Sequence, residues 1–137
     1  MATGYTVGPG TLIFGETGSQ LEISTLTKSA KVTWSVDQED DELFLAGNVE
    51  AGERKFTATL SVTARQELQK DGIVDWSWKN RGKDMPFQFV PDSTAEGQVS
   101  GRIVVTPIDL GGEVGKKPTS DFEWKCVGHP TYTPPNK

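Results

Sequence analysis

Cys126 and His129, the one cysteine and the one histidine of the chain, stand three positions apart near its end. A thiol and an imidazole serve in cysteine nucleophiles and in zinc sites, so this pair is the first place to look for chemistry. A structural zinc site needs four ligands, and a nucleophilic site needs its histidine held in a packed pocket. Because His129 lies in a proline-rich stretch, we expect no catalytic or metal site here, and Cys126 is expected to be a small core residue.

A second candidate is a run of five carboxylates within six positions: Asp37, Glu39, Asp40, Asp41 and Glu42. Calcium prefers carboxylate oxygens, but a calcium loop needs glycine at its sixth position and glutamate at its twelfth. Glu42 and Asn48 stand there instead. The run therefore favours either a solvated loop or a contact surface for another subunit. Crowded carboxylates repel one another, so we expect basic partners from a neighbouring copy. The candidates for that role are Arg54, Lys55, Lys116 and Lys117.

The glycines and lysines of segment 111–117 are similar to those of a phosphate-binding loop. However, Leu110 stands where the first glycine is required, and Pro118 stands where such a loop would continue into a helix. We therefore expect a surface loop.

Four tryptophans offer an aromatic platform of the kind that binds carbohydrate: Trp34, Trp76, Trp78 and Trp124. Trp34 and Trp124 alternate in phase with aliphatic residues, which predicts that they pack in a core. Trp76 and Trp78 cannot be equally buried on one helix, so we expect one of the two to be interfacial.

The composition limits the class of protein. A chain of 137 residues fits one domain, which buries about two-thirds of its unfolded surface. The net charge of −5 disfavours nucleic-acid binding, which needs clustered Lys and Arg. No apolar run reaches the length of a membrane span, no signal peptide is visible, and a single cysteine fits a reducing compartment. We expect no cofactor and no enzymatic activity.

Alternation of apolar and polar residues predicts a mainly β chain. The clearest strand is 54–64, and further strands are expected at 11–14, within 20–36, and at 85–89, 98–105 and 120–126. Segment 66–81 favours one helix, with Asp71 as its N-cap and Gly82 after its end. Flanking parts are an irregular lead-in (1–10), a long loop or hairpin (37–53) and an exposed proline-rich tail (128–137).

The order and spacing of four motifs resemble the major tail tube proteins of long-tailed bacteriophages, particularly those infecting actinobacteria. The motifs are Gly52 to Leu60, Trp76-x-Trp78-x-Asn80-x-Gly82, Pro86 to Pro91, and Ser120 to Trp124. The resemblance implies a two-sheet β-sandwich or barrel-like fold with one flanking helix. Contractile injection tubes share that fold, so the fold alone does not separate the two kinds of tail.

The resemblance also implies a function. Six copies would form a ring, rings would stack into a tube, and viral DNA would pass through the lumen without tight binding. Implied partners are the tape measure protein, the tail terminator and the distal tail or baseplate proteins, with assembly in the bacterial host cytoplasm and residence in the virion tail. The 37–53 excursion would contact the adjacent ring. The alternative is a free-standing β-sandwich module that binds carbohydrate or protein through Trp76 or Trp78.

Overall fold

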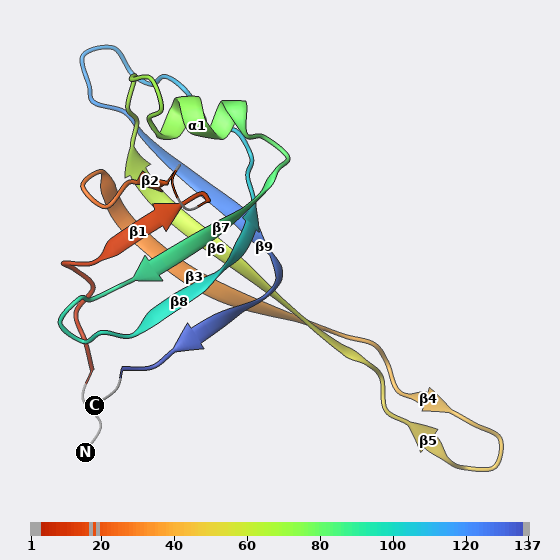
Figure 1. Cartoon of the computed structure of the whole chain (residues 1–137). Coiled ribbons are helices and arrows are strands. Elements are labelled where there is room, and N and C mark those ends of the chain that lie inside the picture. The colour runs from red at the N-terminus through yellow and green to blue at the C-terminus, as the bar shows by residue number, and fades with distance from the viewer. Residues whose placement is uncertain (1–3, 17, 19, 136–137) are drawn as a thin grey trace.

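The computed structural model describes residues 4–16, 18 and 20–135. Nine strands and one helix make up the described chain, and they follow one another in the order shown in Figure 1. The elements are β1 (Thr11–Phe14), β2 (Leu21–Glu22), β3 (Thr27–Gln38), β4 (Glu42–Leu43), β5 (Val49–Glu50), β6 (Arg54–Arg65), α1 (Ile73–Lys79), β7 (Asp84–Val90), β8 (Gln98–Val104) and β9 (Thr119–Thr133).

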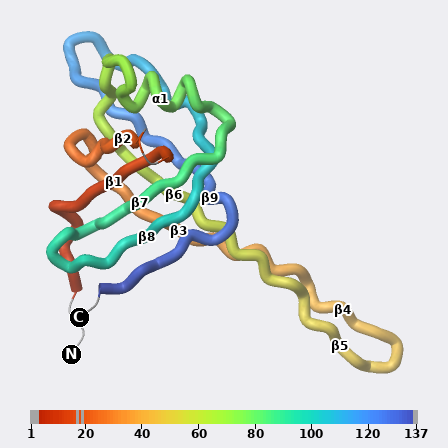
Figure 2. The backbone as a smooth tube through the Cα atoms, in the orientation of Figure 1, coloured from red at the N-terminus to blue at the C-terminus, as the bar shows by residue number. Residues whose placement is uncertain are grey.

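The main sheet has the strand order β2-β1-β7-β8-β9-β6-β3, with every pair antiparallel. Strand β9 belongs to both halves of this sheet, because its first half pairs with β6 and its second half pairs with β8. The strand bends sharply along its length (Figure 2), and Gly128, near the start of its second half, has a φ of 71°. The bend folds one half over the other, so the expected two-sheet, barrel-like β fold with one helix is confirmed.

The core lies between the two halves of the sheet. Phe14 of β1 and Trp124 of β9 are fully buried, with ring centroids 5.0 Å apart. Two further strands also contribute fully buried side chains to this core, namely Leu60 from β6 and Ile103 from β8. The prediction that Trp124 is a core residue is therefore confirmed, and the 54–64 strand buries alternate residues from Ala58 to Ala64, whereas Phe56 is exposed.

The helix is shorter than the predicted 66–81. It spans Ile73–Lys79, and its N-cap is Gly72 rather than Asp71, which has a φ of 63°. Residue 66 does not join the helix because its side chain donates to Gly111 O and to the hydroxyl of Ser120, and residues 69–72 form a turn that leads into the helix. These long-range hydrogen bonds hold the chain against the loop before β9. The helix therefore begins only after the chain has moved away from that loop.

The helix ends are stabilised locally. Asp75 accepts hydrogen bonds from Lys79 Nζ and from the Asp71 backbone N–H, and these bonds hold the pKa of its carboxyl below the usual value. Gly82 has the expected left-handed conformation, with a φ of 78°, two residues after the C-cap Asn80.

Segment 20–36 forms two strands, β2 and β3, joined by a turn in which Leu26 and Thr27 N–H bond to Ile23 O. The register shifts between Thr27 and Ser29, which marks a bulge at Lys28. The lead-in has no regular structure over residues 4–10, and its first three residues lie outside the described part.

The expected exposed tail at 128–137 is largely part of β9, which extends to Thr133. A proline is tolerated there because Pro130 lies at the register shift opposite Gly101, where no ladder N–H is needed. Residues 136 and 137 lie outside the described part.

Candidate functional site

A hairpin that leaves the body is the most distinctive surface feature (Figure 1). Strands β3 and β6 remain paired out to Gln38 and Arg54, and the short strands β4 and β5 then continue the excursion. The tip closes through hydrogen bonds from Phe44 N to Asn48 O and from Gly47 N to Phe44 O. The 37–53 segment is therefore a hairpin rather than a loop.

The junction between stem and tip depends on a close backbone approach. Glu39 N donates to Glu53 O at 2.9 Å, and Gly52 N donates to the Asp41 carboxylate at 2.9 Å. A Cβ at Gly52 would overlap the Glu39 carbonyl, so the two chains can meet here only because residue 52 is glycine.

The five predicted contact carboxylates all lie on this hairpin and are all exposed: Asp37, Glu39, Asp40, Asp41 and Glu42. Asp37 stands opposite Lys55 in the β3–β6 ladder. Within the described part of the chain none of the five takes part in an ion pair, while Asp41 accepts the bond from Gly52. The structure brings them together along one projection, available to a partner.

The inner face of the hairpin base is apolar and uncovered. Trp34 is 51% exposed, and Val36 and Phe56 are similarly exposed. The prediction that Trp34 packs in the core is therefore wrong. Its strand continues past the end of the opposing sheet, so the core-facing side of the strand meets no second layer there.

His129 partly covers this face. Its ring lies edge-on to Trp34 with centroids 5.6 Å apart, and its Nε2 donates to Phe56 O at 3.2 Å. Burial raises the pKa of the neighbouring Cys126 thiol, which disfavours the thiolate that a nucleophile needs. His129 therefore serves as a packing residue of β9.

The two helical tryptophans have different environments. Trp76 is buried and stacks on Phe14 with centroids 5.7 Å apart, so of the two tryptophans it is the one that packs in the core. It faces the core because α1 lies across the end of the sandwich. Trp78 is half exposed, and its Nε1 donates to Ile108 O at 2.8 Å. It remains the candidate interfacial aromatic.

Sequence reasoning assigned no role to the apolar residues at the hairpin tip. Leu43, Leu45 and Val49 are exposed there, and Leu45 is fully so. The available signal was an apolar stretch inside an otherwise charged excursion, which a solvated loop does not need.

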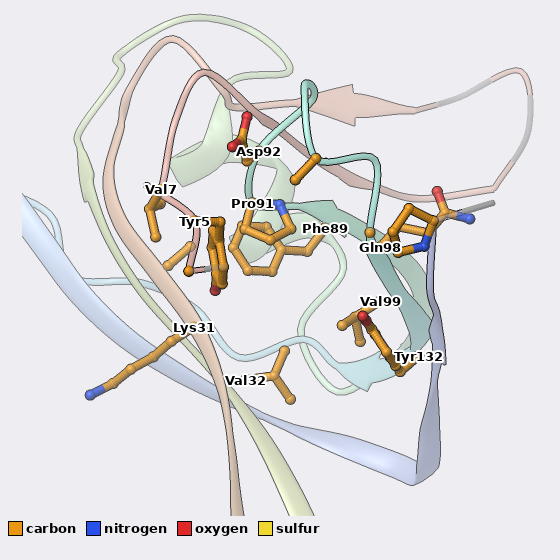
Figure 3. Close-up of a pocket in the computed structure, with 15 residues that line it drawn as sticks. Tyr5, Val7, Lys31, Val32, Phe89, Pro91, Asp92, Gln98, Val99 and Tyr132 are labelled. Atoms are coloured by element: carbon orange, nitrogen blue, oxygen red, sulfur yellow. The ribbon is translucent and has the colours of Figure 1, made fainter. Parts of the chain in front are cut away.

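An open apolar cavity of about 570 Å³ lies between the lead-in, β3 and the start of β8 (Figure 3). Tyr5, Phe89, Val99 and Tyr132 line it, and its charged lining residues are Lys31 and Asp92. This arrangement provides no pair of groups for acid–base or nucleophilic chemistry.

The described residues contain no group of three or more His, Cys, Asp or Glu side chains that could hold a metal ion. No helix among them is long and apolar enough to cross a membrane.

Two packed antiparallel layers, one short helix and a projecting hairpin together define a β fold of the tail-tube type. Solved structures that share this fold include two chains of gene transfer agent particles. One is a chain in the tail of an empty gene transfer agent particle, obtained with helical refinement and C6 symmetry. It is 19% identical, with a TM-score of 0.60, and the match covers 90% of this chain and 95% of that one.

The other is a chain in the virion of a native gene transfer agent particle, 17% identical with a TM-score of 0.59. That match covers 89% of this chain and 95% of the other. No protein-family model matches the sequence, and no curated protein matches it. At these identities the likeness establishes the shared fold.

Proposed function

We propose that this chain is a structural subunit of a phage-like tail, in which six copies form a ring and the rings stack into a tube. The observation that carries the proposal is the shared fold, over nearly the whole of both chains, with a chain from a C6-symmetric tail. In this proposal the chain acts as one domain with no catalytic role, and the order of its four sequence motifs points to a long, non-contractile, actinobacteriophage-like tail.

The sheet edges support assembly. Strand β3 lies at one end of the sheet and is twelve residues long, so its outer backbone groups lack a strand partner among the described residues. Long unpaired edges are an aggregation hazard in a monomer, and closing a ring removes them. The uncovered face at Trp34, Val36 and Phe56 also calls for a covering layer, which a neighbouring copy would supply.

The proposal assigns roles to the exposed groups. The hairpin with its carboxylates contacts an adjacent ring, and Trp78 lies at an interface. The tube encloses a tape measure protein during assembly in the bacterial cytoplasm, and tail terminator and baseplate proteins close its ends. In the virion tail the lumen then delivers DNA to the host.

Negative-stain microscopy of the purified chain tests this function. We expect six-fold rings and tubes of uniform width. A chain that stays monomeric at high concentration and binds a glycan array would instead support the β-sandwich binding module.

A first prediction concerns the carboxylates. Replacing Asp37, Asp40 and Asp41 with Asn and Glu39 with Gln should leave the monomer folded, since exposed charges contribute about 0.5 kcal/mol or less each. Tube yield should change and lose its salt dependence, because ion pairs between copies are screened by salt. Tube yield and melting temperature across a salt series measure both effects. Wild-type yield and salt response would contradict the prediction.

A second prediction concerns DNA. The net charge of −5 per copy makes a six-membered ring strongly acidic, and binding to duplex DNA requires a basic surface that releases counterions from phosphate. We therefore expect neither monomer nor tube to retard duplex DNA near physiological salt. A salt-sensitive gel shift at micromolar protein would contradict this expectation.

A further inference from the structure

The hairpin tip presents apolar side chains at the end of an acidic stem. Leu43, Leu45 and Val49 are exposed, and Asp40 and Glu42 lie next to them. Apolar surface in water costs about 25 cal/mol per Å² relative to a buried state. A charged stem would keep such a hairpin soluble without this apolar tip, so the tip is better explained as a surface that becomes buried in a partner.

A complementary surface stands at the other end of the molecule. The loop from Leu110 to Pro118 exposes the side chains of Leu110 and Val114, the latter 99% exposed. It also exposes Lys116 and Lys117. Lys116 forms an exposed ion pair with Glu113 at 3.2 Å, and Lys117 forms no ion pair within the described residues. The loop thus combines apolar side chains with available positive charge.

This loop is held in place before any partner arrives. Gln66 donates to Gly111 O at 3.1 Å and accepts from Gly111 N at 2.9 Å. The backbone N–H of Gln66 also donates to Pro118 O. Both ends of the loop are therefore fixed to the residue that follows β6, so little ordering free energy opposes docking.

The two surfaces lie at opposite ends of the same strand. Strand β6 begins beside the hairpin at Arg54 and ends at Arg65, which pairs with Thr119 just after the loop. Twelve strand residues span about 40 Å. Figure 1 shows the hairpin at the lower right and the loop at the upper left. A chain cannot join its own two surfaces, but successive copies can join them head to tail.

We propose that the hairpin tip of one copy packs against the 110–118 loop of the next copy along the tube. The leucines and Val49 cover Leu110 and Val114, and the stem carboxylates pair with Lys116 and Lys117, which sets the register of the contact. This inference rests on the proposed stacking function and names the surface that receives the hairpin. The cavity of Figure 3 is the weaker receiver, because it offers one lysine, Lys31, against one carboxylate, Asp92, whereas the loop offers two lysines against Glu113.

Disulfide trapping tests the contact in assembled tubes. In a Cys126→Ser background, the pair Leu45→Cys and Val114→Cys should yield a ladder of linked chains after mild oxidation, and monomers alone when tubes are dissociated beforehand. The matched control pairs Leu45→Cys with Val7→Cys, which is exposed at the cavity. A ladder in the control pair alone, or in neither pair, overturns the proposed contact.

Charge reversal provides an independent readout. The double variant Lys116→Glu/Lys117→Glu should lower tube yield at least tenfold with an unchanged monomer melting temperature, and adding Asp40→Lys and Glu42→Lys should restore tubes. The control Lys70→Glu/Lys83→Glu makes the same change in net charge on other exposed lysines and should assemble normally. Full assembly of the loop variant overturns the contact while leaving the tube function intact. A wild-type chain that forms no tubes overturns both.

Discussion

Replacing Trp124 with alanine will lower the free energy of unfolding of the monomer by about 3–5 kcal/mol, which is much of the stability of a domain this size. Trp124 is fully buried at the centre of the aromatic cluster. Its ring centroid lies 4.6 Å from that of Phe122 and 5.0 Å from that of Phe14. Alanine would leave a cavity that the rigid two-layer sheet can only partly close. Urea unfolding followed by circular dichroism measures the loss.

Trp34→Ala is the matched control, because it removes the same side chain from a site that is half exposed. It should cost about 1 kcal/mol or less. An equal loss of unfolding free energy in the two variants would mean that the aromatic cluster does not stabilise the core more than an exposed tryptophan does.

Backbone amides of residues 39–53 will exchange with solvent at least about 100-fold faster in the monomer than in the assembled tube. Every residue of the hairpin except the half-buried Gly52 is exposed, and two-stranded ribbons are marginally stable in water. The backbone hydrogen bonds of the hairpin therefore open at a free-energy cost near zero unless a partner covers the hairpin. Residues 58–64 of β6, which alternate into the core, provide an internal control of slow exchange in both forms.

Hydrogen–deuterium exchange followed by mass spectrometry measures the difference on matched samples. Equal protection of 39–53 in monomer and tube would contradict the idea that assembly orders the hairpin. Fast exchange in both forms would contradict it as well.

The strands could be predicted because their signal is local. In β6 the alternation of Ala58, Leu60 and Val62 with threonine and serine gives the buried face directly, and Phe122 and Trp124 do the same in β9. A side chain alternates between the faces of a sheet wherever the sheet lies, so no tertiary information is needed.

The same alternation led to the wrong prediction that Trp34 is buried. The pattern places Trp34 on the face of β3 that also carries Val32, and the structure agrees with that face. However, alternation says which side of a sheet a residue is on and not whether a second layer covers it. The length of the opposing sheet decides that, and it depends on residues far away in the sequence.

The helix boundary and the end of β9 were missed for a related reason. Gln66 looked helical in its sequence neighbourhood but is bonded to Gly111 and Ser120, which lie more than forty residues further on. Pro130 looked like a strand breaker but sits at a register shift of the β8–β9 ladder. In both cases a long-range hydrogen-bond pattern overrides the local preference.

By itself the sequence determined the β class, the period of each strand, the central place of Trp124 and the charge of the 37–53 excursion, because each of these depends on neighbouring residues alone. Tertiary structure decided which apolar faces remain open. It turned the excursion into a projecting hairpin with an apolar tip, buried Trp76 while leaving Trp78 exposed, and placed the 110–118 loop at the opposite end of β6. Burial and mutual position depend on how the two halves of the sheet fold over each other, and no local pattern records that arrangement.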